Sequence, residues 1–138
     1  VYNIARVDYE YITGMDEKVT LSEFINNIDN ESSTLELYNA ESTKITDLSE
    51  IVKTGQVIKL VINGKVYDEL YIVLKGDLNG DGKINVSDKV ILQDHILLKN
   101  KITDYRKYGM ELIGDDKINV SDNVKLGEYI LKKIKTLN

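Results

Sequence analysis

Three short runs in the first half of the chain have the apolar and polar pattern of β-strands. Residues 34–38 alternate between apolar and polar side chains, and residues 57–62 and 69–74 are rich in Val, Ile and Leu. The run at 57–62 ends at Asn63-Gly64, and Asn-Gly between two such runs is typical of a β-hairpin with a type I′ turn. The first half is therefore predicted to contain a small sheet that closes with a hairpin.

One helix is predicted in the same half. Thr20-Leu21-Ser22-Glu23 has the spacing of a capping box, in which the Thr and Glu side chains satisfy free N–H groups at the start of a helix. Apolar residues continue the pattern through Ile28. A helix packed on a small sheet predicts an α+β domain, β-grasp-like, for residues 1–75.

The second half contains an internal repeat. Residues 84–88, Ile-Asn-Val-Ser-Asp, recur unchanged at residues 118–122, 34 positions later. In both copies a polar loop leads into a segment with the apolar spacing of a helix. Each helix is predicted to bury one broad apolar face against the other, formed by Val90, Leu92, Ile96 and Leu97 in the first copy and by Val124, Leu126, Ile130 and Leu131 in the second.

The loop of the first copy has the spacing of an EF-hand calcium loop. Counted from Asp77 as position 1, oxygen-bearing side chains stand at positions 1, 3, 5, 9 and 12, and Gly82 stands at position 6. Calcium takes roughly six to eight oxygen ligands, which a tight loop supplies from alternate positions. The other interpretation is a polar turn between strands, but the full spacing and the duplication favour calcium. The predicted ligands are Asp77, Asn79, Asp81, the backbone carbonyl of Lys83, Asn85 and Asp88.

The loop of the second copy departs from this pattern at two positions. Ile113 at position 3 cannot ligate a cation, and Asp116 replaces the glycine at position 6. Asp tolerates the left-handed backbone that this position needs. We expect a second, weaker calcium site with Glu111, Asp115, the carbonyl of Lys117, Asn119 and Asp122 as its ligands. Ile84 and Ile118, at position 8 of each loop, are expected to pair and join the loops.

These residues resemble the type I dockerins of clostridial and related anaerobic bacteria. The resemblance rests on GDLNGDGKINVSDKVILQDHIL (residues 76–97) and its echo IGDDKINVSDNVKLGEYIL (residues 113–131), and it covers the second half of the chain. It implies an all-α, duplicated EF-hand-like dockerin of loop–helix units over residues 76–138. The first half is similar to small domains that precede dockerins, where Thr54-Gly55 opens a strand before the closing hairpin. The predicted fold class is thus two small domains, 1–75 and 76–138.

The resemblance also implies a partner and a setting. A dockerin binds a cohesin module of another protein and anchors a large secreted enzyme, such as a glycoside hydrolase, or a toxin. This fragment is then non-catalytic, extracellular or cell-surface associated, and monomeric when free, with two bound calcium ions. The contacts that the family implies are Val86, Ser87, Gln93, Asp94 and Leu98 in the first copy, and Val120, Ser121, Gly127, Glu128 and Lys132 in the second.

Charge and composition argue against several other classes of function. A net charge of −5 argues against a nucleic-acid partner, because phosphate binding needs a basic face. The sequence has no run of eighteen apolar residues, so no membrane span is predicted. With no Cys and one His, His95, the chain lacks a full set of residues for a Ser-His-Asp triad or a zinc site. The alternative function is a carbohydrate- or cell-surface-binding module with structural calcium. A calcium sensor is the least favoured of the three functions.

Overall fold

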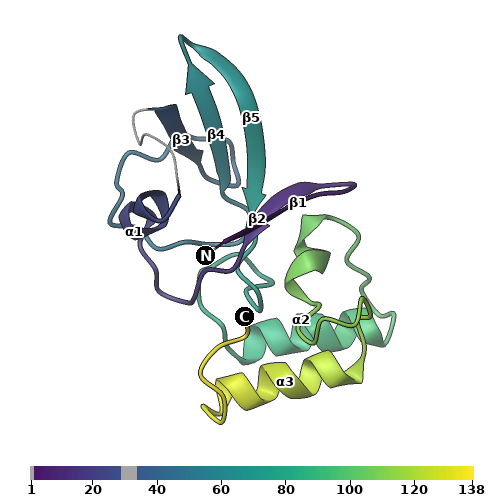
Figure 1. Cartoon of the computed structure of the whole chain (residues 1–138). Coiled ribbons are helices and arrows are strands. Elements are labelled where there is room, and N and C mark those ends of the chain that lie inside the picture. Colours follow the sequence, from purple (N-terminus) through teal and green to yellow (C-terminus); the bar gives the residue numbers. More distant parts are fainter. Residues whose placement is uncertain (1, 29–33) are drawn as a thin grey trace.

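A five-stranded sheet forms the centre of the first half. The computed structural model describes residues 2–28 and 34–138. The strands are β1 (Asn3–Arg6), β2 (Glu10–Thr13), β3 (Leu35–Tyr38), β4 (Val57–Ile62) and β5 (Lys65–Ile72). They lie in the order β1-β2-β5-β4-β3, and only β2 and β5 run parallel (Figure 1). The sheet is therefore mixed.

The turn and the helix start predicted for the first half are confirmed, but the last strand ends at Ile72 and the helix at Asn26, each two residues before its predicted end. Asn63 and Gly64 have φ angles of 52° and 77°, the left-handed pair that a type I′ turn requires, and they join β4 to β5. The helix α1 (Leu21–Asn26) begins at Thr20, whose hydroxyl oxygen accepts the Glu23 N–H at 3.2 Å. The hairpin of β1 and β2 was not predicted, because its strands are only four residues long and β1 is mostly exposed.

The second half consists of two loop–helix units joined by a short 3₁₀ helix. Their helices are α2 (Val86–Ile96) and α3 (Val120–Ile130), with η2 (Tyr105–Gly109) between them. The two α-helices lie side by side (Figure 1). Among the residues that the structure describes, no helix has the length and apolar character that crossing a membrane requires.

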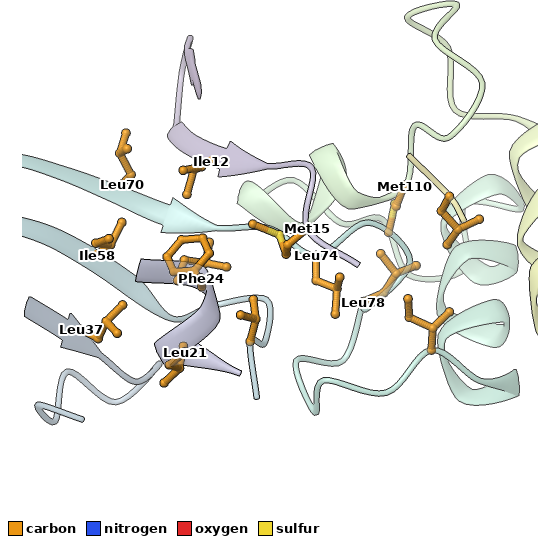
Figure 2. Close-up of a cluster of buried hydrophobic side chains, with 14 of the residues drawn as sticks. Ile12, Met15, Leu21, Phe24, Leu37, Ile58, Leu70, Leu74, Leu78 and Met110 are labelled. Atoms are coloured by element: carbon orange, nitrogen blue, oxygen red, sulfur yellow. The ribbon is translucent and has the colours of Figure 1, made fainter. Parts of the chain in front are cut away.

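One hydrophobic cluster extends through both halves. On the sheet side it contains Phe24 and Ile72, and on the helix side it contains Leu92 and Leu126, all fully buried. Figure 2 shows how Met15, Leu74 and Leu78 continue this cluster from the sheet to Met110 and the helices. Small units bury a small fraction of their surface, and a shared core lets each half use the apolar surface of the other.

The predicted fold class, a β-grasp-like domain followed by an all-α dockerin, is therefore wrong. Over residues 2–28 and 34–138 the chain is a mixed five-stranded sheet with three short α-helices, whose buried side chains form one cluster. The sheet order also differs from a β-grasp, where the first strand lies beside the last. In this chain the last strand, β5, lies beside β2 and not beside β1. Pattern analysis missed this arrangement because the β1–β2 hairpin carries little apolar signal. The boundary predicted at residue 75 stays a prediction.

The predicted apolar face of the two helices is also partly wrong. Leu92 and Leu126 are fully buried, whereas Val90 and Val124 are more than half exposed. The reason is helical geometry: residues two positions apart lie about 200° apart around a helix, on opposite sides. Each helix thus has one apolar face in the core and another in solvent. The solvent face also includes Leu97 and Leu131, 53% and 68% exposed.

Candidate calcium loops

Each predicted calcium loop leads into the capped start of its helix. Asn85 and Asn119 are the N-cap residues of α2 and α3, and their side chains accept the N–H groups of Ser87 and Ser121, each at 3.0 Å. In return, Asp88 accepts the Asn85 N–H in a reciprocal capping box. The two Asn side chains are thus used as caps. EF-hand loops often fill this ninth position through water.

The three carboxylates of each loop converge. One ligand atom from each of Asp77, Asp81 and Asp88 lies within 4.8 Å of the others, and the same holds for Glu111, Asp115 and Asp122. The structure therefore brings the predicted acidic ligands together in both copies, although they are spread over 12 positions of sequence.

Asp77 is the most enclosed of these carboxylates. It is fully buried, and its oxygens accept N–H groups from Gly80 at 3.1 Å, Gly82 at 3.0 Å and Thr54 at 3.0 Å. Burial raises the pKa of Asp77 to about 6, and the nearby charges of Asp88 and Asp81 add to the rise. The raised pKa means that burial and the neighbouring charges disfavour the ionised carboxylate. A bound cation would offset this unfavourable free energy.

Position 12 closes each loop in the same way. Asp88 and Asp122 are fully buried, and each accepts an N–H group from the residue after position 1, Leu78 at 2.8 Å and Leu112 at 2.7 Å. Burial also raises the pKa of Asp88. One carboxylate thus caps a helix and also holds the beginning of its loop.

The remaining predicted ligands of the first loop lie at its exposed rim. The Asn79 side-chain oxygen accepts the Asp81 N–H at 3.2 Å, and Asp81 accepts the Lys83 N–H at 2.9 Å. Gly82 has φ of 79°, as position 6 requires. Of these side chains, Asp81 brings a carboxylate oxygen close to those of Asp77 and Asp88.

The second loop has the same course and fewer contacts with the rest of the chain. Glu111 accepts N–H groups from Ile113 at 3.1 Å and Gly114 at 2.7 Å, both in its own loop. Asp115 accepts the Lys117 N–H at 3.1 Å. Asp116 has φ of 59°, which confirms that an aspartate takes the place of the glycine. Ile113 is 47% exposed and supplies no ligand.

The chemistry of both loops fits calcium. Each provides three carboxylates and backbone carbonyls, the hard oxygen donors that calcium prefers. Among the ion pairs of residues 2–28 and 34–138, none involves these six carboxylates. Three close negative charges that form no ion pair repel one another, and a divalent cation held by these residues would neutralise that repulsion.

Most of the predicted partner contacts lie on the surface. Val86 and Val120 are 64% and 65% exposed and occupy the same place in the two copies. Leu98 is 74% exposed. The remaining exposed residues of this set are Ser87, Gln93, Ser121, Glu128 and Lys132, and Asp94 is half-buried. Gly127 faces the other helix, because a methyl group there would lie 3.1 Å from Lys89 Cε.

Two first-half residues at the loops were not predicted. Thr54 donates its N–H to Asp77, and Glu17 accepts the Ile84 N–H at 2.9 Å. The expected pairing of Ile84 with Ile118 is not among the isolated β-bridges of the described residues, which join other positions. The Thr54-Gly55 dipeptide was the only signal in the sequence, and it was interpreted as the start of a strand.

The tyrosines pack against one another. Tyr71 and Tyr105 stack with ring centroids 4.2 Å apart, and Tyr11 and Tyr108 stack at 4.3 Å. Tyr67, 59% exposed, is the one tyrosine among the exposed large apolar residues of the described chain. Paired rings cover each other's faces, so these contacts stabilise the fold and leave no flat aromatic platform at the pairs.

Comparison with known proteins gives matches among solved structures only. No protein-family model matches the chain, and no curated protein matches it. Two similar structures are complexes from Acetivibrio cellulolyticus, in which the third cohesin of ScaC is bound to a ScaB dockerin changed in its N-terminal or its C-terminal helix. Their TM-scores are 0.44 and 0.42, at 27% and 28% identity.

The aligned stretch covers 46% of this chain and 90% of the matched chain in the first complex, and 44% and 86% in the second. The matched chains are thus about half as long as this one. Both structures are complexes between two proteins.

Proposed function

We propose that this chain is a calcium-dependent docking module that binds a cohesin module of another protein, as a dockerin does. The observation that carries the proposal is the duplication: two carboxylate clusters with the same spacing, each followed by a helix that exposes the same apolar positions. The sequence resemblance of both loop–helix units to type I dockerins supports it.

The exposed apolar side chains supply the docking surface. Val86, Val90 and Leu97 on the first helix correspond to Val120, Val124 and Leu131 on the second, and all six are at least half exposed. Apolar side chains that gather on a surface mark interaction sites. Their repetition at both helices favours a protein partner that meets a two-fold surface.

Calcium has a structural role in this proposal. When bound by Asp77, Asp81 and Asp88, it would offset the repulsion of the three carboxylates and hold the loop against the start of α2. The same holds for Glu111, Asp115 and Asp122 at α3. The first turns of the two helices carry Val86, Ser87, Val120 and Ser121. The docking surface is therefore well ordered only when the loops are well ordered.

The proposal extends to the parent protein. The module itself carries out no catalysis, and it anchors a secreted protein, such as a polysaccharide-degrading enzyme or a toxin, outside the cell. What supports this setting is the resemblance of both halves to the ends of such proteins.

The experiment is a calcium-dependent binding assay with three kinds of immobilised bait: cohesins, dockerins and a glycan array. The expected result is binding to at least one cohesin, lost in excess chelator and restored by calcium. Binding to a dockerin instead would reverse the roles and overturn the proposal. Binding to glycans with no protein partner would establish the alternative, a carbohydrate-binding module with structural calcium.

A further inference from the structure

The first half of the chain touches the first calcium loop at the residue that begins it. Asp77 Oδ2 accepts two backbone N–H groups at 3.0 Å, one from Gly82 in its own loop and one from Thr54, 23 positions earlier. Thr54 is 5% exposed, so this contact lies away from water. A hydrogen bond from a buried N–H to a carboxylate is stronger than one between neutral groups.

Thr54 is itself held in place on its other side. Its hydroxyl oxygen accepts the Leu74 N–H at 2.9 Å and donates to the Leu74 carbonyl at 3.1 Å. Leu74 lies two residues beyond the end of β5 and three residues before Asp77. The same threonine thus fixes both the approach to the loop and its first acidic side chain.

Two loop glycines lie closely against the segment that ends at Thr54. A methyl group at Gly80 would lie 2.9 Å from the Thr54 carbonyl oxygen, and one at Gly82 would lie 2.7 Å from Ile51 Cδ1. At the position equivalent to Gly80 in the second loop, Gly114, a methyl group would meet nothing within 4 Å. The first loop is therefore enclosed by the first half, whereas the second loop is open there.

We infer that the segment at residues 51–54 is part of the first calcium site, with Thr54 as a positioning residue for Asp77. The inference rests on the proposed calcium function and deepens it: the first half prepares one loop of the repeat and leaves the other to its own residues. Because coupling between two sites is reciprocal, calcium at the first loop must in turn stabilise the segment at 51–54.

The two equivalent glycines give a matched test in the full chain. Gly80 and Gly114 have φ of 78° and 89°, so Gly80→Ala and Gly114→Ala impose a similar backbone strain. Only Gly80→Ala also places a methyl group against the Thr54 carbonyl oxygen. Calcium titrations followed by the amide signals of Gly82 and Asp116 report each site separately. We expect Gly80→Ala to weaken its own site at least tenfold more than Gly114→Ala weakens its site. Equal losses would overturn the inference.

A second measurement needs no calcium. In chelated protein, hydrogen exchange of the Thr54 amide should accelerate at least tenfold in Asp77→Ala and remain unchanged in Glu111→Ala. If the chain binds no calcium at all, the proposed function fails, but this exchange still decides whether Asp77 holds Thr54. Equal exchange rates in the two variants would show that the contact between Thr54 and Asp77 positions nothing.

Discussion

The two loop–helix copies have matching local structure and different surroundings. Both helices begin at an Asn cap, bury a central leucine and are followed, two residues after their last residue, by a residue of positive φ, Leu98 at 60° and Lys132 at 61°. In the first copy, however, the residue at position 1 is fully buried beneath the first half of the chain, whereas Glu111 is only half-buried. Local sequence sets the course of each loop, and the neighbouring chain sets how enclosed its ligands are.

The largest expected effect is that of removing calcium, which tests what the two copies share. A chelator should lower both the helical circular dichroism signal and the melting temperature, because three carboxylates in each loop then repel without a cation. At each site, calcium at about 100 times its Kd contributes about 3 kcal/mol, which corresponds to roughly 10 °C per site for a chain of this size. Unchanged melting in chelator would show that neither loop binds calcium.

The next prediction separates the two sites. Asp77→Ala should weaken calcium binding about tenfold more than Glu111→Ala, a difference of about 1.4 kcal/mol, because the first loop has the complete ligand set and a buried Asp77. Isothermal calorimetry measures both. Because the pKa of Asp77 is about 6, protons compete at this site, and calcium affinity should fall as the pH drops below about 6. A tighter second site would contradict this ranking.

Docking is expected to use one copy more than the other. Ser87→Trp and Ser121→Trp place the same bulk at equivalent exposed positions, so they act as controls for each other. The helices differ nearby, since Gln93 and Leu98 stand where the second copy has Gly127 and Lys132. We expect Ser87→Trp to weaken cohesin binding by about 2 kcal/mol, about thirtyfold, with Ser121→Trp close to wild type. Tolerance of each single variant, with loss only in the double variant, would indicate two interchangeable orientations.

A smaller effect is expected at the helix ends. Leu98 and Lys132 both follow a helix in the left-handed region, where a residue with a side chain costs about 1 kcal/mol relative to glycine. Leu98→Gly and Lys132→Gly should therefore each raise the free energy of unfolding by about 1 kcal/mol. Only Leu98→Gly should also weaken cohesin binding, since its exposed leucine is an apolar anchor. Equal binding by the two variants, measured by calorimetry, would assign Leu98 no part in docking.

The smallest effect is a pH dependence present in one copy only. His95 Nδ1 accepts the Ile102 N–H at 2.9 Å, whereas its equivalent, Tyr129, donates its hydroxyl to Glu17 at 2.8 Å. Burial lowers the pKa of His95, and the charge of Lys101 lowers it further. The folded state therefore favours neutral His95, and its contribution is complete above about pH 6.5, the unfolded value. That contribution is lost progressively as the pH falls below about 6.5.

The measurement is the difference in free energy of unfolding between wild type and His95→Gln, in calcium, at pH 7 and pH 5. Glutamine does not titrate and can still accept the Ile102 N–H. Wild type should lose more stability than the variant on acidification. A difference that does not change with pH would show that His95 is not responsible.

The sequence by itself determined the features that depend on neighbouring residues. Backbone preferences act over a few residues, so the sequence predicts the Asn63-Gly64 turn, the cap at Thr20 and the left-handed backbone of Asp116. The repeat of 34 positions is visible in the sequence itself. The convergence of the three carboxylates in each loop follows from the same 12-residue spacing.

Only the tertiary structure decided how the halves meet. The short strands β1 and β2 carry little apolar pattern, and they find their place through pairing with β5. Thr54 contacts Asp77, and Glu17 contacts Ile84, across 23 and 67 positions that no periodicity links. Which apolar face of each helix is buried was likewise settled by packing, since both faces of α2 and α3 carry apolar residues and the shared core can cover one.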